Sequence, residues 1–374
     1  MTPRVVYWNN IPAPYMVDRF NAIAGRANLD FEAWFSARTE DDRSWSVNEE
    51  NWNFRWRYLP KLKVRGQSLA FASQLFAGAA PDLLVGLHAD PCFLVSHPFG
   101  RARGTRIVLW VTPTFDAWLR RRKWKEAVKR IVFSHADAVF TTGSDGRRTA
   151  ERYGSERRRV FVLPHFVDCG YLTTRLAAAA ARRSALRAEL SIRGVTFLYV
   201  GRLWNGKGLD YLVDAFRTLV STTGLEATLV LAGDGPDESR LRRRALDEGL
   251  HVIFPGFYQR DRLARIYALA DVFVFPTLGD PFGHVVEEAM SCGLPVISTS
   301  AAGEIGDRID DGRDGFIVPP RDSRALFERM QQLAMDGSLR NRLGHAAFGR
   351  AAGRTADHWA GEFEAAVDAV LALP

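Results

Sequence analysis

The sequence predicts an α/β protein built from two doubly wound parallel-sheet domains that face a central cleft. The chain has 374 residues, which is enough for two domains of ordinary size. Short apolar runs alternate with helical patterns, as in parallel sheets covered by helices. This alternation stops over Leu172–Ile192, where alanine and arginine dominate, and then starts again. Because ligands bind at the carboxyl ends of parallel strands, we expect the binding site in the cleft.

The N-terminal half contains apolar runs of strand length separated by helical segments. We expect strands at Arg4–Trp8, Phe31–Phe35, Asp82–Leu87, Arg106–Val111, Ala138–Thr142 and Val160–Leu163. The expected helices are Val17–Ala27, Gln67–Gly78 and a long basic helix that begins near Asp116. These elements predict an N-terminal, acceptor-binding domain over residues 1–170, followed by a linker and helix over residues 171–193.

The second half repeats the same alternation. Strands are expected at Phe197–Val200, Ala227–Leu231, Val252–Pro255, Val272–Pro276, Pro295–Ser298 and Gly315–Val318. Helices are expected at Asp210–Val220, Glu238–Glu248, Arg260–Ala268, Val285–Ser291 and Ala325–Asp336. We therefore predict a donor-binding domain over residues 194–355. A last helix within residues 356–374 could pack back on the N-terminal domain.

The net charge and the cysteine content limit the classes of protein to which the chain can belong. The formal net charge is +7, which favours phosphate-bearing substrates, an anionic membrane surface or nucleic acid as partners. The three cysteines form no CxxC pair and show no metal spacing, which is typical of reduced thiols in a cytoplasmic protein. Met1–Asn10 is no signal peptide, and polar residues interrupt the apolar window Leu69–Leu87. We expect a cytoplasmic protein whose membrane association, if any, is peripheral at the inner face.

A glycine-rich loop follows the first strand of the second half. Its sequence, GRLWNGKG, begins at Gly201, contains Arg202 and Lys207, and leads into a helix. Glycines that admit a ligand, helix N–H groups and two cations together suit a diphosphate. The loop is not a Walker motif and lacks GxGxxG. A glycine-rich turn with surface cations is the alternative.

A pair of carboxylates follows the buried strand Val272–Pro276. Asp280 lies in a loop with proline and glycine, and Glu288 lies eight positions later on a helix. Ionised carboxylates only accept hydrogen bonds, which suits sugar hydroxyls. Helix capping by Asp280 and a solvated Glu288 are the alternatives. Glu287 is adjacent, and only one of the two glutamates can face the site, because they lie about 100° apart on the helix.

Several segments in this order resemble one known family. They are GRLWNGKG, LAGDGPD, DVFVFPT, PFGHVVEEAM, CGLPVIS and DGRDGFIVP, with PHFVD at the end of the first half. The set resembles the retaining nucleotide-sugar glycosyltransferases of family four, the group 1 glycosyltransferases, whose GT-B fold has two Rossmann-like domains. The resemblance is almost continuous in the C-terminal half and holds only in outline in the N-terminal half.

The resemblance implies a role for each matching residue. Arg202 and Lys207 match the cations that neutralise the donor diphosphate, and Asp280 matches the carboxylate near the reacting sugar carbon. These three are the expected catalytic residues. Glu288 matches the carboxylate that binds the ribose hydroxyls. The remaining expected donor-binding residues are Gly201, Phe282, Gly283, His284 and Val285, with Phe257 and Tyr258 beside the base.

The sequence departs from the family pattern in both halves. Asp280 replaces the usual glutamate and is one methylene shorter. Val111–Pro113 stands where members of the family often have a histidine. Asn9–Tyr15 stands where they often have a Gly-Gly loop. The candidates for the acceptor side are therefore His88, Asp90, Thr112 and Asp116.

The expected reaction is sugar transfer from a nucleotide sugar to a hydroxyl, with retention by front-face substitution. A UDP-sugar is favoured because the resembling family uses it most, and no cofactor and no metal are expected. The acceptor is open among a lipid-linked or polysaccharide glycan, a small metabolite and a protein. The competing hypotheses are an epimerase or phosphorylase, and a non-catalytic membrane- or polyanion-binding protein with a degenerate donor site.

The basic segment Arg120–Arg130 has seven cations in eleven positions. On a helix these cations could lie on anionic lipid headgroups, and a solvated helix face is the alternative. Nucleic acid is not expected, because no binding module is present. The aromatic residues of Ser44–Tyr58 could stack on a substrate or pack a loop.

Overall fold

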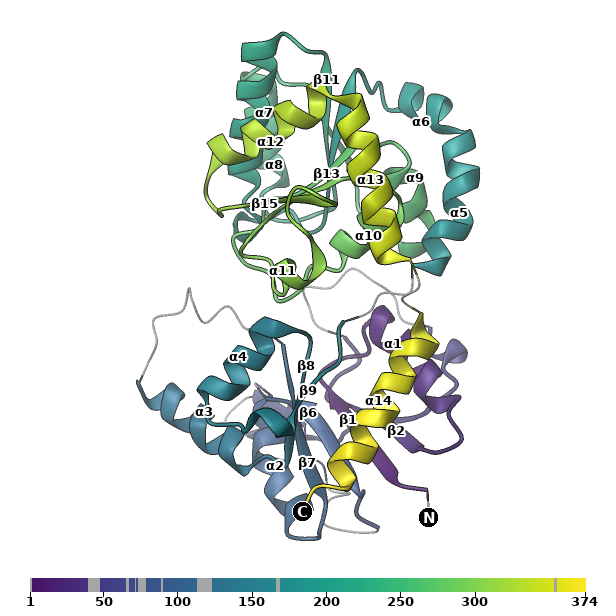
Figure 1. The fold of residues 1–374 in the computed structure, drawn as a ribbon, viewed down its shortest axis with the longest axis vertical. Coiled ribbons are helices and arrows are strands. Elements are labelled where there is room, and N and C mark those ends of the chain that lie inside the picture. The colour runs from purple at the N-terminus through teal and green to yellow at the C-terminus, as the bar shows by residue number, and fades with distance from the viewer. Residues whose placement is uncertain are drawn as a thin grey trace. The chain divides into compact units, whose positions relative to one another are not determined.

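The computed structural model describes residues 2–39, 48–64, 67–70, 72, 79–88, 90–112, 123–165, 169–352 and 355–374. The chain divides into two compact units (Figure 1). Unit 1 comprises residues 1–168 and 354–374, and unit 2 comprises residues 169–353. Each unit contains a parallel sheet with helices on both faces, so the predicted pair of doubly wound α/β domains is confirmed.

The sheet of unit 1 has the strand order β3-β2-β1-β6-β7-β8-β9, and all its pairings are parallel. Its strands are β1 (Arg4–Asn9), β2 (Asp30–Phe35), β3 (Arg55–Tyr58), β6 (Leu83–Leu87), β7 (Arg106–Val111), β8 (Ala138–Thr141) and β9 (Val160–Val162). The helices are α1 (Pro14–Ala24), α2 (Pro91–Arg101), α3 (Lys123–His135), α4 (Ser144–Arg152) and α14 (Ala356–Leu371).

The central strands of unit 1 are apolar on both faces because each face is covered by helices. Along β1, Val5 and Tyr7 belong to the core beneath α1 and α14, whereas Val6 and Trp8 belong to the core beneath α2, α3 and α4. Side chains on a strand alternate between its faces. The continuous apolar run RVVYW therefore signals a strand buried on both sides, as in parallel sheets.

The sheet of unit 2 has the order β12-β11-β10-β13-β14-β15 and is also parallel. Its strands are β10 (Val195–Val200), β11 (Ala227–Ala232), β12 (Val252–Gly256), β13 (Val272–Phe275), β14 (Val296–Thr299) and β15 (Gly315–Val318). The helices are α5 (Gly170–Ala181), α6 (Arg183–Glu189), α7 (Leu209–Thr223), α8 (Glu238–Asp247), α9 (Leu263–Tyr267), α10 (Val285–Ser291), α11 (Ile305–Arg308), α12 (Ser323–Met335) and α13 (Gly337–Ala351). The strand order reverses between β10 and β13, and ligands bind at such a point.

The two segments at the predicted domain borders each pack into one of the two units. The segment 171–193, expected as a linker and helix, contributes α5 and α6, whose Leu172 and Leu186 are buried in the core of unit 2. The final helix, α14, packs against α1 in unit 1. There Arg26 donates a hydrogen bond to the carbonyl of Asp357 at 2.5 Å.

The helix predicted over Gln67–Gly78 is wrong at its beginning. Gln67–Ala70 forms strand β5, which pairs antiparallel with β4 (Lys61–Val64). The nearby partner strand supplies backbone hydrogen bonds, so local pairing outweighs the helical pattern. Residues 73–78 lie outside the described part of the chain.

The described basic helix α3 begins at Lys123, whereas its start was expected near Asp116, and Asp116 lies outside the described residues. Four further helices of the described residues, α2, α4, α11 and α13, had not been predicted. Within the described ranges, no helix is long and apolar enough to cross a membrane.

Candidate functional site

The glycine-rich loop of unit 2 connects β10 to α7 at the point where the strand order reverses. Gly208 has φ +67° and precedes the first residue of α7. A Cβ atom at this position would lie 2.1 Å from the carbonyl oxygen of Pro276, which follows β13. Only glycine fits both the backbone angle and this close approach. The loop is therefore held against the segment that leads to Asp280.

Lys207 and Asp280 form an ion pair across this edge of the sheet. The Lys207 ammonium group contacts Asp280 Oδ2, and the two side chains are 16% and 15% exposed. Asp280 Oδ1 accepts a hydrogen bond from the backbone N–H of Phe282 at 2.9 Å. Asp280 does not cap α10, since the N-cap residue of that helix is His284. The two predicted residues are thus in direct contact, with each oxygen of Asp280 engaged.

Glu288 is buried on α10 and is held by two tyrosines. The Tyr267 hydroxyl donates to Oε2 at 2.7 Å, and the Tyr171 hydroxyl donates to Oε1 at 3.1 Å. Burial raises the pKa of the Glu288 carboxyl, and the two tyrosines and the Arg260 guanidinium oppose that rise. Glu288 is therefore not the solvated side chain of the alternative hypothesis. Each of its oxygens keeps a second lone pair for a ligand hydroxyl.

Glu287 and Glu288 are adjacent on α10 but contact different partners. It is buried and forms an ion pair with Arg308, whose Nη2 lies 2.6 Å from Glu287 Oε2. Arg308 also donates to the carbonyls of Phe282, of Gly303 at 3.2 Å and of Gly283 at 2.8 Å. Its guanidinium carbon lies 3.9 Å from the Phe282 ring centroid. Arg308 thus fixes the turn that leads from Asp280 into α10.

Gly283, in the middle of this turn, has φ +74°, and a Cβ there would lie 2.5 Å from the Phe275 ring. The turn therefore packs directly on the end of β13. The ring of His284 lies 5.0 Å from that of Phe282, and Val285 begins α10. These expected donor-binding residues form one continuous backbone segment beside the Lys207–Asp280 pair.

The other residues predicted to bind the sugar donor lie at the same edge of the unit 2 sheet as the Lys207–Asp280 pair. Gly201 follows β10, and its N–H donates to the Ala232 carbonyl at the end of β11. Arg202 is exposed, and its carbonyl accepts a hydrogen bond from the Tyr199 hydroxyl at 3.0 Å. Phe257 follows β12 and is 43% exposed, whereas Tyr258 packs partly against the core.

Of the residues expected on the acceptor side, His88 and Asp90 make structural contacts within unit 1. His88 is buried, its Nδ1 lies 3.2 Å from the Trp110 carbonyl, and burial lowers its pKa to about 4. It is therefore neutral at physiological pH. Asp90 caps α2 by accepting the N–H of Cys92 at 2.8 Å. Thr112 follows β7 and is half-buried, and Asp116 lies outside the described residues.

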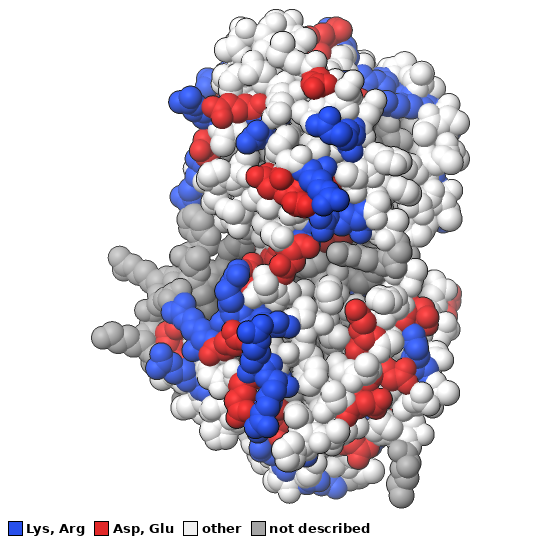
Figure 2. Space-filling model, viewed as in Figure 1, with Lys and Arg blue, Asp and Glu red and all other residues white. Residues whose placement is uncertain are grey.

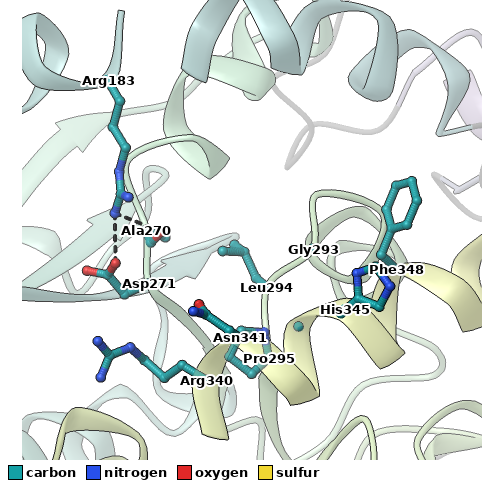
Figure 3. Close-up of a pocket in the computed structure, with 11 residues that line it drawn as sticks. Arg183, Ala270, Asp271, Gly293, Leu294, Pro295, Arg340, Asn341, His345 and Phe348 are labelled. Atoms are coloured by element: carbon teal, nitrogen blue, oxygen red, sulfur yellow. Dashed lines mark hydrogen bonds and ion pairs between the residues drawn. The ribbon is translucent and has the colours of Figure 1, made fainter. Parts of the chain in front are cut away.

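A cavity of about 380 Å³ lies at the opposite edge of the unit 2 sheet (Figure 3). Its lining includes Asp271 and Leu294, which come just before β13 and β14, together with Arg340 from α13. Arg183 donates to Asp271 across it at 2.7 Å. The cavity is therefore distinct from the site at the carboxyl ends of the strands. Among the described residues, no group of His, Cys, Asp and Glu is arranged to hold a metal ion.

Comparison with known structures identifies the architecture. The HepE protein of Anabaena, solved with UDP, matches with a TM-score of 0.78 at 17% identity, covering 98% of this chain and 99% of that one. Sucrose-phosphate synthase of Thermosynechococcus elongatus matches with a TM-score of 0.74 at 18% identity, covering 98% of each chain. The fold is GT-B, the fold of nucleotide-sugar glycosyltransferases.

Comparison of sequences then gives the family of the second domain. Residues 194–336 match the family described as glycosyl transferases group 1. The D-inositol 3-phosphate glycosyltransferase of Acidothermus cellulolyticus is 33% identical over 232 residues, which are 59% of this chain and 50% of that protein. Sulfoquinovosyl transferase SQD2 of Arabidopsis thaliana is 35% identical over 288 residues, 76% of this chain and 54% of that protein. The chain thus spans about half the length of these relatives, and residues 194–336 form a group 1 glycosyltransferase domain.

Sequence reasoning missed three residues that hold this site, namely Tyr171, Tyr267 and Arg308. They come from α5, α9 and α11, and each is far from its carboxylate partner in sequence. The spacing of residues along the sequence does not indicate which distant carboxylate a tyrosine or arginine on a helix will contact.

Proposed function

We propose that this protein transfers a sugar from a nucleoside-diphosphate sugar to a hydroxyl acceptor, with the donor bound at the carboxyl edge of the unit 2 sheet. The observation that supports this most strongly is the Lys207–Asp280 pair beside the Gly201–Gly208 loop and the α7 N-terminus. A fixed cation, helix N–H groups and a carboxylate that accepts hydroxyls lie together there. This combination suits a diphosphate joined to a sugar.

The proposed reaction is a front-face substitution with retention. The bond between the sugar carbon and the diphosphate oxygen breaks, the acceptor oxygen bonds to that carbon on the same face, and the departing phosphate oxygen takes the acceptor proton. Lys207 and Arg202 stabilise the charge that develops on the leaving diphosphate. These side chains supply that stabilisation themselves, so we propose a reaction that needs no metal or other cofactor.

We propose a UDP-sugar as donor. The support is that the structural neighbour HepE was solved with UDP and with UDP-glucose. In this proposal Glu288 accepts the ribose hydroxyls with the lone pairs that the two tyrosines leave available, and Phe257 and Tyr258 border the base. For the acceptor we propose a glycan on a lipid carrier or on a polysaccharide, and glycosylation of a small metabolite is the alternative.

The experiment is to incubate the purified chain with UDP-, GDP- and ADP-sugars and to measure release of nucleoside diphosphate. We expect release from a UDP-sugar, unchanged by a metal chelator and lowered in Arg202→Ala. Proton NMR of a transferred product should show the anomeric configuration of the donor. No release from any nucleotide sugar would favour the non-catalytic, polyanion-binding alternative.

Donor affinity is expected to weaken at mildly acidic pH. Ribose hydroxyls donate to the ionised Glu288 carboxylate, and burial raises the pKa of this group. When the pH is lowered, the affinity for the donor should therefore begin to fall at a higher pH than it would if an exposed glutamate bound the ribose. Calorimetry should use UDP-glucose, because a terminal phosphate such as that of UDP titrates itself near pH 6, about the value for a phosphate monoester.

The matched variant for this titration is Glu288→Gln, which keeps the size of the side chain and removes its charge. Its affinity for UDP-glucose should be lower at neutral pH and flat across the acidic range. A wild-type profile without pH dependence, or the same profile in Glu288→Gln, would show that this carboxylate does not bind the donor.

A further inference from the structure

The cavity at the edge of the unit 2 sheet opposite the Lys207–Asp280 pair is built from residues that the proposed transfer reaction does not use (Figure 3). Its volume of about 380 Å³ suits a small molecule. Its walls come from α6, from the turns before β13 and β14, and from α13. A Cβ atom at Gly344 of α13 would lie 2.2 Å from the carbonyl oxygen of Gly293. Helix α13 therefore packs directly on the turn before β14, and the cavity is part of the folded unit.

The two arginines that line the cavity have unused hydrogen-bond donors. Arg183 donates through Nη2 to Asp271 at 2.7 Å and to two backbone carbonyls, but its Nε atom is buried without a partner. Arg340 donates through Nη1 to the carbonyls of Leu333 and Ala334 at the end of α12. Its Nε and Nη2 atoms make no hydrogen bond with the described residues. Because a guanidinium has five N–H donors, both arginines can bind a further acceptor.

The charge of the lining is positive. In the described part of the chain, Asp271 is the one acidic residue that lines the cavity. Its carboxylate has two arginine partners, Arg183 at 2.7 Å and Arg187 at 3.7 Å, so its charge is more than balanced. Asp336, the acidic residue that caps α13, does not line the cavity. Figure 2 shows Lys and Arg side chains on the surface of unit 2 over α6 and the beginning of α13. The cavity therefore favours an anion.

The side of the cavity away from the arginines is aromatic. Figure 3 shows Arg183 and Arg340 on one side and His345 and Phe348 of α13 on the other. Phe348 is 42% exposed, so its ring can pack on a ligand. The side chains of Asn341 and His345 make no hydrogen bond within the described ranges, which leaves an amide and an imidazole for ligand hydroxyls. The lining thus suits a molecule with an anionic group at one end and a hydroxylated carbon skeleton at the other.

We propose that this cavity binds the phosphate monoester of a sugar or a similar small polyol. In this proposal the phosphate accepts N–H groups of Arg183 and Arg340, because planar guanidinium groups match the geometry of phosphate oxygens. The carbon skeleton packs on Phe348 and Leu294, and a hydroxyl bonds to Asn341. The proposal does not rest on the proposed transferase function, because none of the residues assigned to the donor lines the cavity.

The test is calorimetric titration of the full chain with glucose 6-phosphate as probe, and with inorganic phosphate and glucose for comparison. The pH should be well above about 6, so that the phosphate is a dianion. We expect glucose 6-phosphate to bind more tightly than inorganic phosphate, and glucose to show no measurable binding.

Charge variants at His345 test whether the probe lies in the cavity. His345 is exposed, so its replacement should not unfold the chain. His345→Glu should lower the affinity for glucose 6-phosphate about ten-fold, because it places a negative charge beside the dianion, and His345→Lys should raise the affinity. A purely structural effect would change the affinity in the same direction in both variants. The matched control is Arg342→Gln, which removes a charge from an exposed position of α13 outside the cavity and should bind like the wild type.

Lys207→Met separates the cavity from the loop proposed to hold the donor diphosphate, and it should leave the binding of glucose 6-phosphate unchanged. Binding that Lys207→Met abolishes and His345→Glu keeps would assign the phosphate to that loop and overturn the proposal. Absence of binding, or glucose 6-phosphate that binds no more tightly than inorganic phosphate or glucose, would overturn it as well. Either failure leaves the proposed release of nucleoside diphosphate from a UDP-sugar untouched, because that activity is measured without the probe.

Discussion

Replacing Arg308 with methionine is expected to destabilise the protein by about 3–5 kcal/mol, the usual cost of leaving one partner of a buried ion pair alone. Glu287 would remain buried without its counter-charge, and the carbonyls of Phe282, Gly283 and Gly303 would lose their donor. This loss is large against the roughly 5–15 kcal/mol that stabilises a typical domain. Calorimetric unfolding should show a lower transition temperature, and UDP-glucose should bind more weakly because the turn before α10 is no longer fixed.

Two further variants separate the charge from the packing. Glu287→Met together with Arg308→Met removes both charges and should be more stable than Arg308→Met alone. Arg324→Met, which breaks an exposed pair with Glu328 in the same unit, should change stability by less than about 1 kcal/mol. Equal stability of Arg308→Met and Arg324→Met would contradict the role of Arg308 as the buried support of the turn.

Replacing Lys207 with methionine is expected to lower kcat with a UDP-sugar by about 10²–10³-fold, the scale for loss of one fixed group that stabilises developing charge. The Lys207 ammonium lies beside the loop and α7 N-terminus proposed to hold the diphosphate, with little exposure to solvent. Steady-state kinetics against the wild type measures the effect, and Lys207→Arg should recover part of the rate because it restores the charge.

A double variant decides what Lys207 does. Because Asp280 is itself an expected catalytic residue, the reference for the double variant is Asp280→Asn alone. If the only task of Lys207 were to neutralise Asp280, adding Lys207→Met to Asp280→Asn would cause no further loss of kcat. If Lys207 acts on the donor diphosphate, the double variant is slower than Asp280→Asn, and equal rates of these two variants would contradict the assignment of Lys207 to the donor.

The parts of the fold that follow from local pattern were predictable from sequence. Buried strands such as β1 and β10 appear as continuous apolar runs, since both faces are covered. The Gly201–Gly208 loop was recognisable because its glycines are required by backbone geometry, as at Gly208. Helix α2 escaped prediction although Asp90 caps it and Pro91 begins it, because its exposed side is apolar and no polar stripe marks its period.

The supporting contacts of the site depend on tertiary structure and could not be predicted. Sequence places Glu287 and Glu288 side by side, but their environments differ because α11 brings Arg308 to one and α5 and α9 bring tyrosines to the other. Likewise, the strand β5 arises because β4 is available as a partner, and no helical periodicity within Gln67–Ala70 can reveal that.

We propose that unit 2 binds a nucleotide through Glu288 and the Gly201–Gly208 loop that contains Lys207. Its most direct test is calorimetric titration of the purified chain with UDP, GDP and ADP, repeated with Glu288→Gln and with the partly exposed control Glu238→Gln on α8. We predict that one nucleotide, UDP, binds clearly more tightly than the others, that Glu288→Gln weakens this binding and that Glu238→Gln keeps it. Absence of binding by all three nucleotides, or UDP binding that Glu288→Gln leaves unchanged, would contradict the donor site described here.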